Sequence, residues 1–436
     1  MSLCNHLTTG FRHGLWTFCF FLLWLSPVTA QDRDEGAPPV PSETETETTE
    51  EFKPARFLYP SGGQLTVGGN GFGVGSQLAD PSALKGTHRT PIVLAGSDRN
   101  STLNLTAYYA NWFSERQRFL AEVNVDPYFL GADIGYSVQP SGWDGVLSAN
   151  FTMSSGRAAP FEGGYRNIDI RPGIEDAWLY QLSGGLEYTR SFTEHLDLAT
   201  AISYQRVQIA DEQFGGRITP YDTLGGQLTG SPSGTDHFLY LSTHGVYSTL
   251  NDRDLPTEGT KIRFGLEHAA ALGSGNSPFT RFSANIAQLI SVPGPGEGAS
   301  SLLLNLQGGT MGGNVPAWGG FSLGGVNSVR GYFSGELATT KSFLQASAEY
   351  RAHLTTFQAF GMTHHLRGVL FADWATDFDA SSQILGQPGL SRQKNGHGAG
   401  YGLGLHLAGD AGLFRLETGW NDRGRNSVWL TVGDRF

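Results

Sequence analysis

Cysteine is nearly absent from this 436-residue sequence, since its only two cysteines, Cys4 and Cys19, lie close to the amino end. The chain beyond them therefore uses neither disulfide bonds nor cysteine metal ligands. Long apolar runs are also missing. The run from Leu15 to Leu25 is shorter than the roughly 20 apolar residues that a membrane-spanning helix requires, and no later run approaches that length. These absences exclude a membrane protein built from helices.

Clusters of basic residues are lacking as well. The formal net charge is -11, only 16% of the residues are charged, and lysine and arginine form no stripe. Phosphate binding needs such a stripe, so a nucleic-acid partner is excluded. The sequence is instead rich in glycine, with 60 residues, and contains 12% aromatic residues. This composition is typical of neither a helical bundle nor a disordered chain, and it favours many short strands.

The amino end divides into two short segments before the main domain. Residues 1–30 carry Arg12 ahead of the apolar run and small residues before a cut at Gln31, which is the pattern of a secretory signal peptide. Residues 31–53 are acidic, rich in Pro, Thr and Glu and almost free of apolar side chains, so we expect a disordered leader. Residues 54–436 form the predicted folded domain.

From residue 54 onward, segments of alternating polarity are separated by Gly, Pro, Asn and Asp. Residues 342–354 show the pattern most clearly, because small or apolar residues occupy one parity and polar residues the other, with Phe343 as the exception. The same alternation recurs in residues 261–268, 302–307, 401–407 and 413–420. A period of two indicates β-strands with one apolar and one polar face.

Two architectures fit this alternation: a soluble sandwich with its apolar face inward, and a transmembrane barrel with its apolar face toward lipid. Three features favour the barrel. They are a signal peptide without later cysteines, strands of about 9 to 11 residues with aromatics near their ends, and paired charges on the polar face. The chain end adds a fourth, because Val428, Leu430 and Val432 alternate toward a terminal Phe436, a signal characteristic of bacterial outer-membrane barrels.

The expected fold is an all-β transmembrane antiparallel barrel of about 16 strands, an even number as in single-chain bacterial barrels. A weak first strand is expected between about residues 57 and 95. The others are predicted near 100–111, 118–128, 131–139, 145–155, 180–190, 197–209, 238–249, 260–270, 280–292, 300–311, 341–354, 366–375, 399–408, 413–421 and 426–436. With both chain ends in the periplasm, residues 324–332 (GGVNSVRGY) lie in the sixth external loop, and residues 251–260 (NDRDLPTEGT) form a periplasmic turn.

The carboxyl half resembles a known family, the BamA/TamA-type outer-membrane assembly barrels or bacterial surface antigens, whose relatives are the two-partner secretion transporters. Five pieces carry the resemblance in this order: NDRDLPTEGTKI, FSLGGVNSVRGY followed by GEL, SFLQASAEYR, GVLFADWA, and the run from GYGLGLHL to VWLTVGDRF. The match is close over roughly residues 241–436. Residues 54–240 fit only as further strands.

In this family the sixth loop folds back into the barrel, and its arginine contacts acidic residues of the inner wall. The resemblance implies that Arg330 is this arginine, that Asp373 is its first-choice partner and that Glu349 is its second. The loop would then act as a plug or latch. Its implied motif consists of Gly324, Gly325, Val329, Arg330, Gly331 and Tyr332.

Parity supports Asp373 independently of the family. Leu370, Ala372 and Trp374 form the apolar side of their strand, which turns Asp373 toward the lumen, where a carboxylate needs a cation. A guanidinium can bind such a carboxylate with two parallel hydrogen bonds. The family pattern Phe-x-Asp-x-Gly ends here in Ala375 instead of glycine, and this departure concerns the local backbone rather than the aspartate.

The resemblance implies insertion, assembly or translocation of proteins at an outer membrane. The alternatives are a two-partner-type secretion pore and a passive or structural pore without insertase activity. An enzyme is not expected, because the G-x-S-x-G match at residues 320–324 is catalytic only on a strand-to-helix turn above an α/β sheet. No cofactor is expected, and the pair His364 and His365 lacks carboxylates at ligand spacing, so no metal is expected either.

The expected location is the outer membrane of a diderm, Gram-negative-type bacterium, reached by Sec-type export. The candidate partners are outer-membrane lipid and either unfolded outer-membrane proteins or one exported protein. Assembly barrels of the family carry POTRA domains ahead of the barrel, and the short leader at residues 31–53 has no room for one. A separate periplasmic protein is therefore a further candidate partner, in place of POTRA domains.

Overall fold

The computed structural model describes residues 92–97, 100–110, 117–126, 129–252, 255–273, 275–296, 298–359, 362–409, 412–432 and 435. The predicted signal peptide, the predicted leader, most of the window for the first strand and the terminal Phe436 lie outside these residues. Among the described residues, no helix has the length and apolar character needed to cross a membrane.

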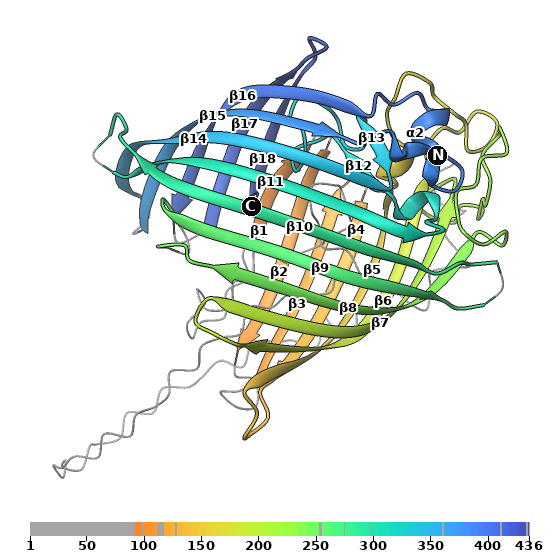
Figure 1. The fold of residues 1–436 in the computed structure, drawn as a ribbon, viewed down its shortest axis with the longest axis horizontal. Coiled ribbons are helices and arrows are strands. Elements are labelled where there is room, and N and C mark those ends of the chain that lie inside the picture. Colours follow the sequence, from red (N-terminus) through yellow and green to blue (C-terminus); the bar gives the residue numbers. More distant parts are fainter. Residues whose placement is uncertain are drawn as a thin grey trace, which may run out of the picture. The chain divides into compact units, whose positions relative to one another are not determined.

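Sixteen antiparallel strands of the described chain form a closed barrel, in which neighbours along the chain are neighbours in the sheet (Figure 1). The strands are β1 (Ile92–Ser97), β2 (Asn100–Ala110), β3 (Gln117–Asp126), β4 (Phe129–Val138), β5 (Gly145–Arg157), β6 (Trp178–Ser191), β7 (Leu196–Ala210), β8 (Thr235–Ser248), β9 (Gly259–Ala271), β10 (Phe279–Val292), β11 (Ser300–Gly313), β14 (Ser342–Ala359), β15 (Met362–Thr376), β16 (His397–Gly409), β17 (Gly412–Asn421) and β18 (Asn426–Val432). The predicted barrel is therefore confirmed.

The largest difference from the predicted strands concerns β14 and β15, which meet at Ala359 and Met362 instead of near residues 354 and 366. The register between them shifts at His353 and Thr355, where β14 carries a β-bulge. One extra residue exchanges the two faces of a strand. The alternation therefore breaks at this point although the strand continues, and the strand predicted from the alternation ended too early.

The apolar parity of the strands faces outward and the polar parity faces inward. On β15, Leu370 and Trp374 are 58% and 42% exposed, whereas Arg367 and Asp373 are buried on the opposite face. A soluble sandwich would bury its apolar face instead. The sandwich alternative is therefore wrong. Apolar side chains exposed on the outer face, such as Leu370 and Trp374, are typical of a barrel that faces lipid.

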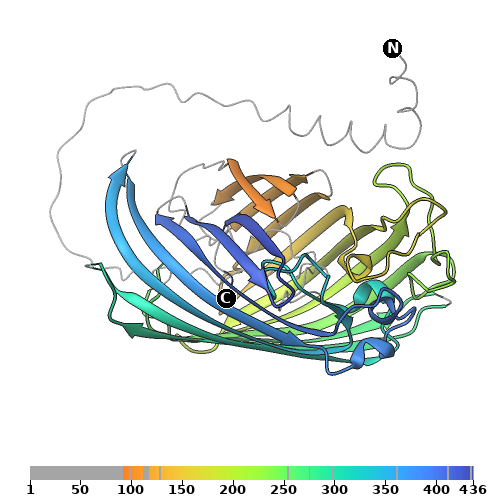
Figure 2. The same ribbon diagram turned by 90° about the horizontal axis from the view of Figure 1, so that it is seen from above.

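The connections after odd-numbered barrel positions gather at one end, as Figures 1 and 2 both show around α2 (Pro388–Ser391). The sixth of them, residues 314–341, contains the short helix η3 (Ala317–Gly319) and a hairpin of β12 (Phe321–Leu323) and β13 (Ala338–Thr340). We call this segment loop 6. Its apolar side chains join those of the neighbouring loops and strands in one buried cluster, so loop 6 packs against the barrel and its neighbouring loops.

Neighbouring loops add short helices to the same end. They are η2 (Ala159–Phe161), between β5 and β6, and η4 (Ala380–Gln383), which precedes α2 between β15 and β16. The connection between β8 and β9, of which residues 249–252 and 255–258 are described, lies at the opposite end of the barrel. Successive connections alternate between the two ends of the barrel, so loop 6 and the connection between β8 and β9 lie at opposite ends, as predicted.

Candidate functional site

Loop 6 carries glycines where its backbone turns sharply. Gly324, Gly325 and Gly331 have positive φ angles of 107°, 94° and 98°, a region that favours glycine. A Cβ added to Gly331 would lie 2.6 Å from the backbone nitrogen of Asn421 on β17. The glycines therefore let the loop bend and approach the barrel wall closely.

Arg330 lies fully buried at the tip of this loop and binds Asp373 of β15. Its Nε lies 2.7 Å from Oδ2 of Asp373, and its Nη2 lies 2.9 Å from Oδ1, which makes a two-pronged pair. The backbone N–H of Arg330 also donates to Oδ2, at 3.1 Å. The partner named first from the sequence is thus in contact with the arginine through three hydrogen bonds.

Two more carboxylates complete the surroundings of Arg330. Its Nη2 lies 2.8 Å from Oε1 of Glu349 on β14, and its Nη1 donates to Oε1 of Glu417 on β17 at 2.9 Å. The guanidinium carbon lies 3.4 Å from the ring centroid of Phe371, a cation–π contact. One side chain of loop 6 therefore connects three strands of the barrel wall.

A second guanidinium, that of Arg435, enters the same cluster from the end of the chain. Its Nη1 lies 2.9 Å from Oδ1 of Asp373 and 3.7 Å from Oε1 of Glu349, and its Nη2 donates to the backbone oxygen of Ser328. Arg435 follows β18, the last strand of the barrel. The cluster therefore joins loop 6 to the strand that closes the barrel.

Flanking cations support two of the carboxylates from the wall itself. Arg351 lies 2.9 Å from Glu349, and Arg415 lies 3.7 Å from Glu417. His406 contacts Glu417 at 3.1 Å. Buried charges are costly unless they are paired, so the three carboxylates and the arginines around them depend on one another. We call Arg330, Asp373, Glu349, Glu417 and Arg435 the latch cluster.

Sequence reasoning missed Glu417 and Arg435. Glu417 lies on the polar parity of β17, but β16 separates β17 from β15, so the contact with Arg330 depends on the register of three strands. The available signal was the run of glycines on the inward parity of β16. A Cβ at Gly400 would collide with the backbone oxygen of Arg330, and one at Gly402 would lie 2.5 Å from the ring of Phe371. These glycines leave room for the arginine.

The rest of the motif is held by β17 and the turn that follows it. Val329 and Tyr332 are fully buried, and the Tyr332 hydroxyl donates to the Asp422 carboxylate. Burial and this aspartate raise the pKa of the Tyr332 phenol above its ordinary value, which keeps the hydroxyl protonated as a donor. The Asn421 amide donates to the backbone oxygen of Gly331 at 2.9 Å. Both sides of Arg330 are therefore fixed.

The base of loop 6 is tied to neighbouring loops through Lys394. Its Nζ donates to the backbone oxygens of Pro160, at 3.0 Å, and Gly335, at 2.6 Å, and lies 2.9 Å from Oγ1 of Thr339. Burial, together with the nearby Arg392 guanidinium, lowers the pKa of this ammonium group well below its usual value. At the other edge, the Trp318 indole donates to Asp236 at 2.6 Å. Loop 6 is thus anchored at its base as well as at its tip.

The remaining predicted residues lie apart from the latch cluster. Val428 and Leu430 are exposed on the outward face of β18, while the side chain of Val432 and all of Phe436 lie outside the described structure. Ser322, of the G-x-S-x-G match, is buried in β12, which pairs with β13 and leads into no helix. Within the described residues, no group of three or more His, Cys, Asp or Glu side chains could hold a metal ion.

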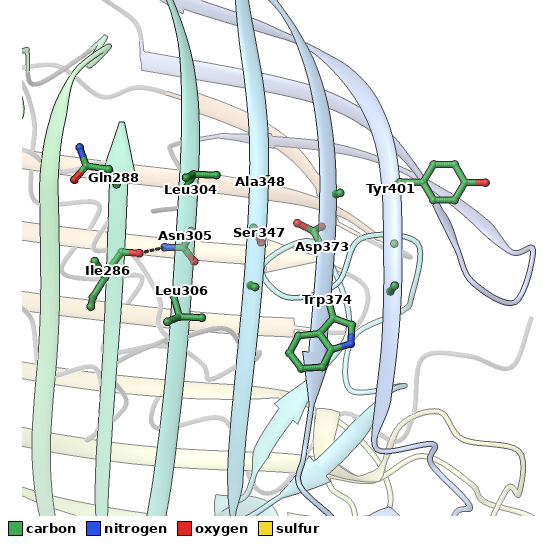
Figure 3. Close-up of a pocket in the computed structure, with 14 residues that line it drawn as sticks. Ile286, Gln288, Leu304, Asn305, Leu306, Ser347, Ala348, Asp373, Trp374 and Tyr401 are labelled. Atoms are coloured by element: carbon green, nitrogen blue, oxygen red, sulfur yellow. Dashed lines mark hydrogen bonds between the residues drawn. The ribbon is translucent and has the colours of Figure 1, made fainter. Parts of the chain in front are cut away.

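A groove of about 710 Å³ lies on the barrel wall and is lined by residues of β10, β11, β14, β15 and β16 (Figure 3). Small residues of β14 and β15 form its floor, and Leu304, Leu306 and Trp374 stand beside it. These three side chains are exposed on the outward parity, whereas the neighbouring Asp373 is buried on the inward parity. The wall is thus apolar on one surface and carries the latch cluster on the other.

The fold and this site define a transmembrane β-barrel in which loop 6 is anchored in the lumen by a buried arginine. The model of the Omp85 superfamily domain matches residues 97–436, and the chain belongs to this superfamily. The resemblance to BamA/TamA-type barrels drawn from the sequence is confirmed at this level.

The curated relatives include plant proteins. Outer envelope protein 80, chloroplastic, of Arabidopsis thaliana is 28% identical over 255 residues, which cover 58% of this chain and 32% of that protein. Protein TOC75, chloroplastic, of Oryza sativa subsp. japonica is 26% identical over 283 residues, which cover 62% of this chain and 33% of that protein. The chain thus spans about a third of the length of these relatives.

Two solved structures have a similar fold. BamA from Haemophilus ducreyi lacking POTRA domains 1–3 gives a TM-score of 0.56 at 12% identity and covers 79% of this chain and 70% of that chain. CdiB from Escherichia coli gives a TM-score of 0.50 at 12% identity, with 78% and 61% covered. At this identity the likeness extends to the fold alone.

Proposed function

We propose that this chain inserts or translocates proteins at an outer membrane. The observation that carries the proposal is the anchoring of loop 6 by Arg330, which binds carboxylates on three strands inside a barrel of the Omp85 superfamily. The name of one relative, outer envelope protein 80, and the fold shared with BamA support an outer-membrane location.

The proposed mechanism uses the junction between the first and last strands. Strands β1 and β18 have six and seven residues, and within the described residues they share one register pair, Gly96 with Leu430. A short junction is inexpensive to open, and the exposed strand edge can pair with an incoming client strand. Client strands would thus be received at this seam.

The latch cluster would hold the rest of the barrel while the seam opens. Arg330 ties loop 6 to β14, β15 and β17, and Arg435 ties the end of β18 to the same aspartate. Movement of β18 away from β1 therefore changes the surroundings of the loop. This connection supports a role in which the seam and the lumen respond to each other.

A two-partner-type secretion pore is the second candidate. The fold shared with CdiB from Escherichia coli favours it. In this proposal the exported protein passes through the lumen and not through the seam. A passive pore that keeps the fold without insertase activity is the third. In none of these proposals does the chain act as an enzyme or require a cofactor.

The proposed partners are outer-membrane lipid, client proteins and a separate periplasmic protein. The client is a set of unfolded outer-membrane proteins in the first proposal and one exported protein in the second. A diderm bacterium as the source remains a prediction from the sequence, since the chloroplast proteins among the relatives point equally to an organelle's envelope.

Depletion of the chain in its native host, followed by a census of outer-membrane proteins, separates these functions. Loss of a broad set of barrels supports insertion, and loss of one exported protein supports secretion. An unchanged census with altered permeability supports a passive pore. Rescue with Arg330→Ala tests the latch, because a protein that still restores the census would show that the anchored loop is dispensable.

A further inference from the structure

In the turn between β8 and β9, the described residues 249–252 and 255–258 are held by hydrogen bonds from their own side chains. Asn251 accepts from the backbone N–H groups of Thr257 and Glu258, both at 3.1 Å, and donates to the Thr257 hydroxyl at 2.9 Å. Asp252 accepts from the backbone N–H of Leu255 at 2.8 Å. These bonds fix the described residues of the turn relative to one another, which a simple connection between strands does not need.

This turn does not extend freely from the barrel. Leu250 packs against Ala287, Leu289 and Leu303, which form a small buried apolar cluster. These three residues occupy the inward parity of β10 and β11, which is polar at neighbouring positions such as Asn305. An apolar patch on a polar lumen wall violates the strand pattern, and the packing of Leu250 gives it a partner.

The turn also reaches β15, four strands away from β9 around the barrel. Nη2 of Arg367 donates to the backbone oxygen of Leu255 at 3.3 Å, and Arg367 is buried on the lumen face. Asp373, which binds loop 6, lies six residues further along the same face of the same strand. One face of β15 thus anchors a segment from each end of the barrel.

We propose that residues 249–252 and 255–258 form a strap that narrows the lumen at the end opposite loop 6. The strap is held by the apolar patch on β10 and β11 and by Arg367. The lumen then contains two constrictions in series, and removal of either one leaves the other. This inference depends on the barrel alone and not on whether the chain inserts, secretes or conducts passively.

Conductance of the purified full chain in planar lipid bilayers tests the series arrangement. The variants are Arg330→Ala, which releases loop 6, Leu250→Ser with Arg367→Ala, which releases the strap, and the combination of all three changes. In a series of two constrictions each release alone gives a small increase. The combined release should raise conductance by more than the product of the two separate fold increases.

The matched control is Glu194→Gln in the connection between β6 and β7 at the same end of the barrel, whose side chain is 76% exposed and lies outside the strap, so it should leave the conductance unchanged. A shift on unboiled gels between folded and unfolded forms verifies that each variant still forms the barrel. If the combined variant conducts no better than Arg330→Ala alone, the strap does not narrow the lumen and the proposal is overturned.

Thiol labelling tests the strap without relying on a pore. In a background with Cys4→Ser and Cys19→Ser, Leu250→Cys should react more slowly with a bulky impermeant reagent than Glu258→Cys does. Adding Arg367→Ala should speed the labelling of Leu250→Cys and leave that of Glu258→Cys unchanged. Equal rates at the two positions with Arg367 intact would show that Leu250 is not covered by the wall.

Discussion

The wall that holds loop 6 and the seam that closes the barrel differ in almost every respect. Strands β14 and β15 have 18 and 15 residues and pair over nearly their whole length, whereas β1 and β18 have six and seven and share one described register pair. Local stability in a protein is uneven, and segments with few paired groups open first. The difference supports the proposal that one side of the barrel is fixed and that the seam opens.

The fixed side is also where the buried charges are concentrated. Arg330 and Arg435 both bind Asp373, and Glu349 and Glu417 lie beside them. Paired buried charges are poor sources of net stability, yet removing one partner is costly. The cluster therefore specifies one position for loop 6 rather than simply strengthening the wall.

The largest effect on the fixed side is expected from Arg330→Ala. Three carboxylates lose their shared cation, so the free energy of unfolding should fall by about 3 to 5 kcal/mol, and by less where lumen water reaches the cluster. Arg330→Lys should resemble Ala more than the native residue, because an ammonium cannot form the two-pronged pair. Denaturant titration of the folded barrel in detergent measures both changes.

A double-mutant cycle identifies the partner that matters most. Arg330→Ala and Asp373→Ala should cost less together than the sum of their separate costs, because each breaks the same pair. Strictly additive costs would contradict the assignment of Asp373 as the principal partner. The same cycle with Glu349→Ala and with Glu417→Ala would then show which carboxylate replaces it.

The next effect distinguishes the outer surface from the lumen. Leu416→Arg should destabilise the barrel by about 2 to 4 kcal/mol if it lies near the bilayer midplane, because Leu416 is 50% exposed on the lipid-facing parity. Ser347→Arg, on the lumen face near Asp373, should cost far less. Refolding titrations into lipid vesicles measure this difference. Equal costs would mean that the assignment of the two faces is wrong.

A smaller effect is expected from Arg435→Ala. Asp373 loses one of its two guanidinium partners and Glu349 loses one of its three, but both keep Arg330. The loss should therefore be about 1 to 3 kcal/mol, the cost of an unsatisfied buried group. The same denaturant titration measures it, with Arg190→Ala as a control, because the Arg190 side chain is 44% exposed and pairs with the exposed Asp144. A loss as large as that of Arg330→Ala would show that the chain end, not the loop, is the main anchor.

The smallest effect concerns pH and the loops at the end that carries loop 6. Burial opposes the charged form of Asp211, but hydrogen bonds from Arg171 and from the backbone N–H of Arg217 outweigh it and lower the pKa of this carboxyl. The stabilisation is therefore complete above the ordinary aspartate pKa of about 3.9 and is lost as the pH falls through the lowered value.

Limited proteolysis of residues 211–234 at falling pH measures this effect. The native chain should become more susceptible in the acid range, whereas Asp211→Asn should be susceptible at every pH tested. A native chain whose loop stays protected below the pKa range of carboxyl groups would show that this ion pair does not hold the loop.

The sequence predicted the barrel well because alternation is a local property. Leu370 and Asp373 could be assigned to opposite faces from their parity alone, and the family motif pointed to Arg330. Glu417 and Arg435 could not be found in this way, because their contacts depend on how strands distant in the chain are aligned. The extension of β14 beyond residue 354 escaped for another reason, since a bulge reversed the pattern that revealed the strand.

The opening of the seam is the central claim, and a disulfide across it is the most direct test. Gly96 and Leu430 are paired across β1 and β18, and Leu416 and Leu430 are paired across β17 and β18, so Gly96→Cys with Leu430→Cys has a matched control in Leu416→Cys with Leu430→Cys. Both pairs are introduced without Cys4 and Cys19, and the assembly of client barrels is measured after the native chain is depleted. We predict that the oxidised seam pair blocks assembly until it is reduced, while the control pair supports it throughout. Equal assembly with both disulfides closed would contradict the proposal that the seam opens.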